Sequence, residues 1–433
     1  MIAKRLFLLV TVLFVLFPQQ ARAEYRFIVR VGDGLPSIQR ICTGLGCTVK
    51  EELDGALGQL FLVSVPDSVS PNIFLQLLQS QIGVSDVELD IPINILPIPG
   101  SYAEVPSGLS DSRPYNYFGK TVWNGYANQP ASAVIGLNVA RASFNVLGSG
   151  IVGVIDTGID PSHPALQSVV VIGYDFTRNT RGIPSESSDL TQPVSPTVTG
   201  VPPARVNEST AAVLDQNSAL VLGQNQYAAF GHGTMVSGVI HLVAPNALIM
   251  PLKAFRADGT GSLSDIIRAV YYGTQNGAKI LNMSFSTPNY SKELARALKN
   301  AAANGVISVG SVGNDGKQIL VYPAALDEVM GVASTDYMDQ RSSFSNYGSV
   351  VWVAAPGEAI IGTYPFGTYA ASWGTSFSAP FVSGVAALLL DIQSDCSQKQ
   401  AASAISNARK LGSDLGYGRL DVYKAVQALI NSR

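Results

Sequence analysis

Short apolar runs separated by amphipathic segments begin at residue 151, and this alternation constrains the fold more than any other feature of the sequence. Residues 151–155 form a continuous apolar run with no alternating polar positions, which is typical of a strand buried on both faces. Similar runs predict further strands at residues 247–252, 279–284, 306–310 and 329–333. Helices are expected between strands at residues 263–276 and 292–304, with Ser262 or Ser264 and with Ser291 as N-caps. Residues 130–433 are therefore expected to form an α/β domain, a doubly wound and mainly parallel sheet with helices on both faces.

The first 23 residues have the parts of a signal peptide. Lys4 and Arg5 precede an apolar run over residues 6–17, and a small-residue pattern follows at residues 21–23. A membrane anchor is the alternative, but the run is shorter than the roughly 20 apolar residues that a spanning helix needs. We therefore expect cleavage after Ala23 and a secreted or extracytoplasmic protein, with no stable membrane span after the signal is removed.

Residues 24–100 predict a small α+β unit in front of the α/β domain. Its strands are expected at residues 25–31, 60–65 and 84–89, and a helix at residues 73–78. A unit of about 70 residues lies near the lower end of what folds unaided. Residues 92–114 are rich in Pro and Gly and have the composition of a linker. The domain boundary is placed there, with residues 101–129 as linker and start of the mature region.

The cysteines indicate one local disulfide. Cys42 and Cys47 are close enough in sequence to close a small loop, which an exported protein permits, and Cys396 would remain a buried free thiol. A zinc site is not expected, because there is no second cysteine pair and the histidines lie far downstream. The 28 basic and 31 acidic residues include no basic run, so nucleic acid is not an expected partner.

Residues 177–227 are rich in Pro, Ser, Thr, Asn and Gly and show little periodicity. Such a length is unusual for a connection inside a compact domain. We expect this stretch to be a surface insertion.

Three polar residues have the chemistry that serine-based hydrolysis requires. Asp156 ends the strand at 151–155, where side chains of open α/β sheets face a ligand crevice. His232 lies between two glycines, and Ser376 opens an apolar helix whose N-terminal amides favour an oxyanion. Such a mechanism needs a hydroxyl, an imidazole base, a carboxylate that orients the base, and oxyanion donors. Taken singly, each residue has a structural alternative: a turn aspartate, a buried histidine and an N-cap serine.

Taken in chain order, these segments resemble the subtilisin-like serine peptidase family. The matching motifs are Val154-Ile155-Asp156-Thr157-Gly158, Gly231-His232-Gly233-Thr234 and Gly374-Thr375-Ser376-Phe377-Ser378-Ala379-Pro380. Residues 311–316 and 416–421 resemble the family's oxyanion-asparagine segment and its C-terminal helix entry. The resemblance implies Asp156, His232 and Ser376 as the catalytic triad and Asn314 as the side-chain oxyanion donor. It also implies that residues 24–100 are a ferredoxin-like pro-region, which inhibits the catalytic domain and assists its folding.

The resemblance further implies a groove for an extended peptide. Its expected substrate-binding residues are Gly259, Thr260 and Gly261 on an edge segment and Ser284, Phe285 and Ser286 on the opposite side. The sequence departs from the family pattern at two positions. Ser286 stands where glycine usually lines the primary specificity pocket, and Met235 replaces a histidine that is common after the catalytic one.

No metal and no cofactor is expected. The calcium-binding loop that many subtilisins insert after the histidine helix is missing. Calcium needs roughly six to eight oxygen ligands, which Asp160 with a few local carbonyls cannot supply. Asp160 is expected to bond to turn amides or to His163.

Three functions can use a serine, a histidine and an aspartate. The first is a serine endopeptidase made as a self-processing precursor, with protein or peptide substrates and its own pro-region as intramolecular inhibitor. The second is a catalytically silent scaffold, against which the intact triad and Asn314 argue. The third is an esterase of the α/β-hydrolase kind, which needs the chain order Ser, Asp, His and a Gly-x-Ser-x-Gly motif around the nucleophile. Because Ser376 fits neither requirement, the endopeptidase is the prediction.

Overall fold

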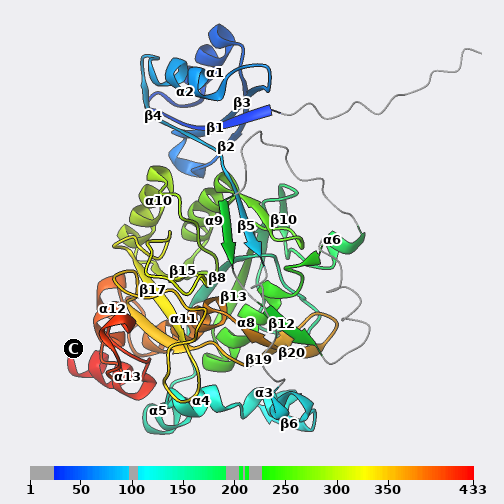
Figure 1. Ribbon diagram of the computed structural model, residues 1–433, viewed down its shortest axis with the longest axis vertical. Helices are drawn as coiled ribbons and strands as arrows, with labels where there is room; N and C mark the ends of the chain where they lie inside the picture. Colours follow the sequence, from blue (N-terminus) through cyan, green and yellow to red (C-terminus); the bar gives the residue numbers. More distant parts are fainter. Residues whose placement is uncertain (1–23, 97–105, 192–203, 208–209, 214–226) are drawn as a thin grey trace, which may run out of the picture.

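An eight-stranded sheet forms the centre of the larger part of the molecule (Figure 1). The computed structural model describes residues 24–96, 106–191, 204–207, 210–213 and 227–433. The strands of this sheet are β8 (Ile151–Asp156), β9 (Gly173–Asp175), β10 (Thr180–Gly182), β13 (Leu248–Lys253), β15 (Ala278–Met283), β16 (Ile307–Ser311), β17 (Val329–Thr335) and β18 (Val353–Pro356). Their order is β10-β9-β13-β8-β15-β16-β17-β18, in which β10 pairs antiparallel and the other neighbours are parallel. The predicted mainly parallel sheet is confirmed.

Helices pack on both faces of this sheet. The main ones are α8 (His232–Val243), α9 (Leu263–Gln275), α10 (Lys292–Ala303), α11 (Thr375–Ile392), α12 (Gln398–Ile405) and α13 (Val422–Asn431). The side chains of β8 divide between the two faces: Val152 and Val154 share a core with α8 and α11, whereas Ile155 shares one with α9 and α10. The doubly wound arrangement is therefore confirmed.

The two predicted N-cap positions are occupied by serine side chains. Ser262 Oγ accepts from the Asp265 amide at 3.2 Å, and Ser291 Oγ accepts from the Leu294 amide at 3.0 Å. Ser264, the alternative cap, lies inside α9. These caps fix where α9 and α10 begin.

A separate four-stranded antiparallel sheet builds the N-terminal unit, drawn in blue in Figure 1. Its elements are β1 (Glu24–Val31), α1 (Gly34–Leu45), β2 (Thr48–Glu52), β3 (Leu60–Pro66), α2 (Pro71–Gln79) and β4 (Val84–Leu89). The strand order β2-β3-β1-β4 with two helices is the ferredoxin-like arrangement. Cys42 and Cys47 form the predicted disulfide between α1 and β2, and the Cys396 thiol is buried.

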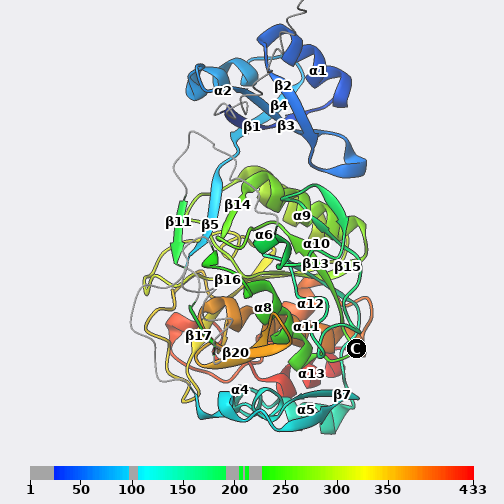
Figure 2. The ribbon, with the colours of Figure 1, turned by 90° about the vertical axis from the view of Figure 1, so that its right-hand side faces the viewer.

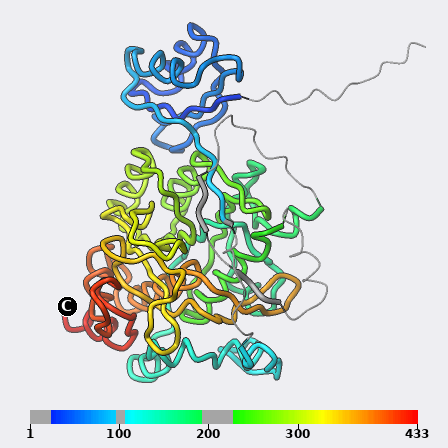
Figure 3. Tube along the Cα trace, viewed as in Figure 1, coloured from blue at the N-terminus to red at the C-terminus, as the bar shows by residue number. Residues whose placement is uncertain are grey.

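The stretch predicted to be a linker is structured where it is described. Pro92–Leu96 forms strand β5, and the tube in Figure 3 follows the chain from the N-terminal unit into the larger part at this strand. Further on, Tyr117 and Tyr126 are buried in the core, where their hydroxyls donate to the carbonyls of Leu242 and Gly238 in α8. Neither strand β5 nor the burial of these tyrosines could be predicted from the composition, because each depends on partners far away in the sequence.

Helix α11 is long and apolar enough to cross a membrane by length and composition. Inside the protein, however, 89% of its apolar window is buried, and it packs against α8 and α13. Within the described residues it is a core helix of the α/β domain.

Candidate active site

Asp156 and His232 meet at the carboxyl edge of the central sheet. Asp156 is the last residue of β8, is fully buried, and accepts a hydrogen bond from His232 Nδ1 at 2.7 Å through Oδ1. The same oxygen accepts from the Thr157 amide at 2.7 Å. A carboxylate bonded to Nδ1 fixes the imidazole tautomer and leaves Nε2 as the basic nitrogen.

The glycines that flank His232 are required by close neighbours. Gly231 has φ +89°, and a Cβ there would lie 2.2 Å from the ring of Tyr364. A Cβ on Gly233 would lie 2.2 Å from the carbonyl oxygen of Gly158. The predicted close approach of another backbone is therefore present, and it comes from the turn after Asp156.

Ser376 lies at the N-terminus of α11, where it is fully buried. Its hydroxyl donates to the Ser284 carbonyl at 3.2 Å. The next residue, Phe377, packs its ring 5.4 Å from the imidazole of His232, so the serine and the histidine belong to adjacent helix starts. Asp156, His232 and Ser376, which lie far apart in the sequence, are thus brought to one edge of the sheet.

Pro380 lies inside α11, in the second turn of the helix that begins at Thr375. A proline there removes the N–H that would bond the carbonyl four residues earlier, which belongs to Ser376. The Ser284 hydroxyl donates to that carbonyl at 2.8 Å and takes the place of the missing N–H. Ser284 in turn accepts from Asn282 Nδ2 at 2.9 Å.

Asn314 lies after β16 beside the start of α11. Its Oδ1 accepts from the Thr375 amide at 2.8 Å. That bond identifies which end of the side-chain amide is the acceptor, so Nδ2 is the end that can donate. The residue predicted as an oxyanion donor is therefore held next to Ser376.

The residues predicted to bind substrate lie in two separate segments of the structure. β14 (Thr260–Ser262) pairs antiparallel with β5, and the Ile95 amide donates to the Gly259 carbonyl at 2.7 Å. A Cβ on Gly259 would lie 1.9 Å from the Ile95 carbonyl oxygen, so glycine is needed for this close approach. On the other side Ser284, Phe285 and Ser286 are fully buried, and Phe285 packs against Phe255.

Strand β5 also has a partner from the long insertion. β11 (Ala204–Asn207) pairs parallel with β5, so β5 is the central strand of a three-stranded sheet β11-β5-β14, whose labels lie side by side in Figure 2. Part of the stretch expected to be a surface insertion, residues 177–227, is therefore in regular structure, and residues 192–203, 208–209 and 214–226 of it lie outside the described residues.

Two acidic residues of this insertion were missed as site residues. Glu186 is 1% exposed and Asp189 is 5% exposed. Asp189 Oδ2 accepts from the buried Lys253 ammonium at 2.9 Å, and Glu186 contacts the residues that follow Asp156 and His232. Their polar, aperiodic sequence context carries no signal of burial, because most of their donors, Thr157, Gly233, Thr234 and Lys253, come from other parts of the chain.

The remaining histidines have structural positions. His163 Nε2 bonds to the Thr368 carbonyl at 2.9 Å. His241 is buried in α8, and burial lowers its pKa to about 4. Asp160 accepts from the Ser162 and Phe366 amides, each at 2.9 Å, which is the turn-amide role expected of it.

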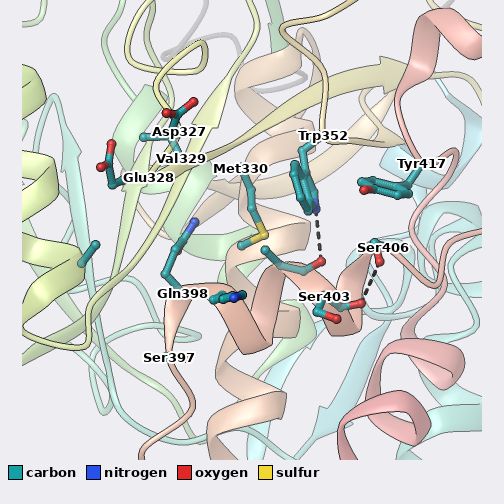
Figure 4. A pocket seen from close by; sticks show the side chains of 13 residues that line it. Asp327, Glu328, Val329, Met330, Trp352, Ser397, Gln398, Ser403, Ser406 and Tyr417 are labelled. Atoms are coloured by element: carbon teal, nitrogen blue, oxygen red, sulfur yellow. Dashed lines mark hydrogen bonds between the residues drawn. The ribbon is translucent and has the colours of Figure 1, made fainter. Parts of the chain in front are cut away.

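A cavity of about 540 Å³ beside α12 shares no lining residue with the predicted site (Figure 4). Its walls include Met330, Trp352 and Tyr417, and the Trp352 indole N–H donates to the Ala402 carbonyl at 3.2 Å. In the part of the chain that the structure describes, no group of three or more His, Cys, Asp or Glu residues is arranged to hold a metal ion.

Comparisons with known proteins agree with this architecture. The model of the subtilase family matches residues 148–421. The chain is 33% identical over 293 residues to thermitase of Thermoactinomyces vulgaris, an alignment that covers 65% of this chain and 90% of thermitase. It is 32% identical over 280 residues to the thermophilic serine proteinase of Bacillus sp. (strain AK1), covering 64% of this chain and 61% of that protein.

A solved structure is similar over most of the chain. Fervidolysin of Fervidobacterium pennivorans, a keratinolytic enzyme related to subtilisin, superimposes with a TM-score of 0.69 and 22% identity. The match covers 95% of this chain and 62% of that one, and at this identity it shows the fold. Together with the family model, these comparisons establish that the chain belongs to the subtilase family, the subtilisin-like serine endopeptidases.

Proposed function

We propose that this chain is a secreted serine endopeptidase, made as a precursor that processes itself. Ser376 Oγ attacks the carbonyl carbon of the scissile peptide bond while His232 Nε2 takes its proton. Asp156 holds the imidazolium, and Asn314 Nδ2 with the Ser376 amide stabilises the oxyanion. His232 then gives its proton to the leaving amine, and water attacks the acyl-enzyme with His232 again as base.

The observation that carries this proposal is the bond between Asp156 and His232. Its length of 2.7 Å and the burial of both side chains are what an orienting carboxylate needs. Ser376 at the start of α11, next to the Phe377 ring that contacts His232, supplies the nucleophile at the same edge. Neither a silent scaffold nor an α/β-hydrolase explains this placement together with Asn314.

The groove supports a peptide substrate. β5 occupies the central position between β14 and β11, in extended conformation and paired through its backbone on both sides. Backbone pairing is independent of side-chain identity, so other extended peptides can form it equally well. We infer that a substrate takes the place of β5 once the pro-region has left.

The proposal that residues 24–100 inhibit the enzyme rests on how the N-terminal unit contacts the catalytic domain. Glu88 accepts from the Ser291 hydroxyl at 2.7 Å and from the Glu293 amide at 3.2 Å, at the start of α10. Asp90 accepts from the amide and hydroxyl of Ser264 at 2.8 and 2.9 Å, at the start of α9. These bonds attach the N-terminal unit to the starts of α9 and α10, and β5 leads from the unit into the catalytic domain (Figure 1).

Ion pairs strengthen the same interface. Arg30 binds Glu293 through two nitrogens, at 3.0 and 2.7 Å, and Glu293 is fully buried by the contact. Arg268 of α9 pairs with Glu51 at 2.8 Å. Bidentate pairs with a buried partner contribute more than exposed ones. An inhibitor anchored this way and threaded through the groove blocks substrate access until it is cut.

The test compares the full chain with Ser376→Ala after expression in a protease-deficient secretion host. The unaltered chain is expected to begin at Glu24 on export, to lose its N-terminal unit, and to clear casein in a zymogram. Ser376→Ala is expected to accumulate as the uncut precursor and to clear nothing. Hydrolysis of a small ester by the unaltered chain without cleavage of casein would contradict the endopeptidase. Maturation of the Ser376→Ala chain would contradict self-processing.

A further inference from the structure

Glu186 lies behind the Asp156–His232 pair and bonds to the residues that follow each of them. Its Oε1 accepts from the Thr157 hydroxyl and from the Gly233 amide, the latter at 3.2 Å. Its Oε2 accepts from the Thr234 hydroxyl. One carboxylate therefore connects the turn after Asp156 to the first turn of α8, which carries His232.

The Thr157 hydroxyl can serve either of two carboxylates. Its oxygen lies 3.2 Å from Asp156 Oδ1 and within hydrogen-bond distance of Glu186 Oε1, yet it has one proton to donate. When Glu186 is ionised it takes the protons of both threonine hydroxyls. When Glu186 is protonated it becomes a donor itself, and the Thr157 proton can turn to Asp156.

The charged and titratable groups around Glu186 belong to several different strands and turns. Burial is the main reason that the pKa of Glu186 is raised to about 7. The charge of Asp156 at the end of β8 also raises this pKa, whereas the hydrogen bonds from Thr157 and Thr234 and the charge of Lys253 of β13 lower it. The Lys253 ammonium is bound by Asp189. Tyr364, the last residue of strand β19 (Ile360–Tyr364), is a further titratable neighbour of Glu186. Glu186 therefore changes charge in the pH range in which a histidine base also titrates.

We propose that Glu186 is a positioning residue of the active site, which holds Thr157 and Thr234 and makes the Asp156–His232 pair more basic when it is ionised. This rests on the proposed function, because it assigns a partner to the same base. The Glu186 carboxylate bonds to the amide of Gly233, the residue after His232, and a negative charge there favours the imidazolium. The Thr157 proton is at the same time withdrawn from Asp156, so that Asp156 holds the imidazolium more strongly. No covalent step is involved.

The variant Glu186→Gln keeps the shape and removes the charge, and Glu186→Asp keeps the charge and shortens the side chain. A unit charge within several ångströms at an effective dielectric constant of about 20 shifts a neighbouring pKa by on the order of one unit. In Glu186→Gln the acidic limb of kcat/KM is therefore expected to move to lower pH by about one unit, with a lower plateau of kcat and an unchanged KM. Glu186→Asp is expected to keep the limb in place while kcat falls.

If the acidic limb of kcat/KM does not move in Glu186→Gln and only thermal stability is lost, the proposal is overturned and Glu186 is a structural residue. If Glu186→Gln does not fold, the Ser376→Ala precursor supplies the second measurement by NMR. There the Glu186 carboxyl carbon is expected to titrate near pH 7, coupled to the His232 Nδ1 proton, and independent titration would equally overturn it. Complete loss of activity in Ser376→Ala alongside an unshifted limb in Glu186→Gln would remove the role of Glu186 and leave the proposed function standing.

Discussion

The hydroxyl of Ser284 offers a sharp test of how the nucleophile is held. It donates to the Ser376 carbonyl at 2.8 Å, in the position where Pro380 provides no N–H. Ser284→Ala removes this donor from a fully buried carbonyl, and a lost bond to a buried acceptor costs about 1–3 kcal/mol. For a catalytic domain of this size, about 1 kcal/mol corresponds to roughly 2 °C in Tm, so the expected loss is about 2–6 °C.

The double variant Ser284→Ala with Pro380→Ala separates this explanation from general damage. An alanine at position 380 restores a helical N–H that can bond the Ser376 carbonyl. Part of the stability lost in Ser284→Ala should therefore return in the double variant. Ser383→Ala is the matched control, because it breaks a bond of the same network, Ser383 Oγ to Asn282 Oδ1 at 2.8 Å, without touching Ser376.

The assay is thermal unfolding of protein inhibited with a serine-reactive reagent, together with kcat and KM on a peptide substrate. A coupling energy between positions 284 and 380 above about 0.5 kcal/mol is expected, since contacting residues are non-additive. kcat should fall in Ser284→Ala and recover in the double variant. Strictly additive losses of stability and no recovery of kcat would refute the view that Ser284 replaces the proline's missing donor.

Three further predictions concern the oxyanion, the pro-region and metal. Asn314→Ala should lower kcat by about 10²–10³, a magnitude taken from the corresponding asparagine of subtilisin, while KM changes little; a rise in KM at constant kcat would contradict a transition-state role. Burial raises the pKa of Glu88 at the pro-region interface to about 7 from an ordinary value of 4.5, so the complex holds one proton more than its parts between these values. Affinity of the separate pro-region for the mature enzyme, measured by inhibition, should therefore fall as pH rises from about 4.5 to about 7 and level off above; Glu88→Gln should flatten the dependence, and an affinity that rises with pH would refute it. Because the Asp160 carboxylate is bound by the Ser162 and Phe366 amides, EDTA should neither inactivate the mature enzyme nor lower its Tm by more than a few degrees, and a large drop that calcium reverses would show that a metal site exists.

The central strands could be predicted from sequence because strands buried on both faces consist mostly of apolar residues. β8 and β17 lie between two layers of helices, so nearly every residue is apolar and the runs stand out. Strand β2, Thr48–Glu52, was not predicted because it is short, none of its residues is fully buried, and three of the five are charged. Strand β5 was hidden by its Pro-rich surroundings, since what makes it a strand is pairing with β14 and β11.

Some residues of the candidate site could likewise be predicted from the sequence, and one could not. Asp156, His232 and Ser376 stand in short motifs whose order along the chain resembles the subtilisin-like family, and that resemblance predicted the pairing of Asp156 with His232 that the structure contains. Glu186 stands in no recognisable motif. Its three donors, Thr157, Gly233 and Thr234, are distant in the sequence, so nothing next to Glu186 indicates its role. A buried carboxylate satisfied entirely by distant partners becomes visible only when the chain is folded.

The most direct measurement of the proposed mechanism is the site of reaction with diisopropyl fluorophosphate, read by peptide mass spectrometry of the processed enzyme. One adduct per molecule is expected, on Ser376, with complete loss of peptide hydrolysis at the same stoichiometry. Labelling should also be absent from His232→Ala whose N-terminal unit has been removed by an added protease, because the hydroxyl then has no base. An adduct on any other serine, or full hydrolytic activity after Ser376 has been modified, would contradict the assignment of the nucleophile.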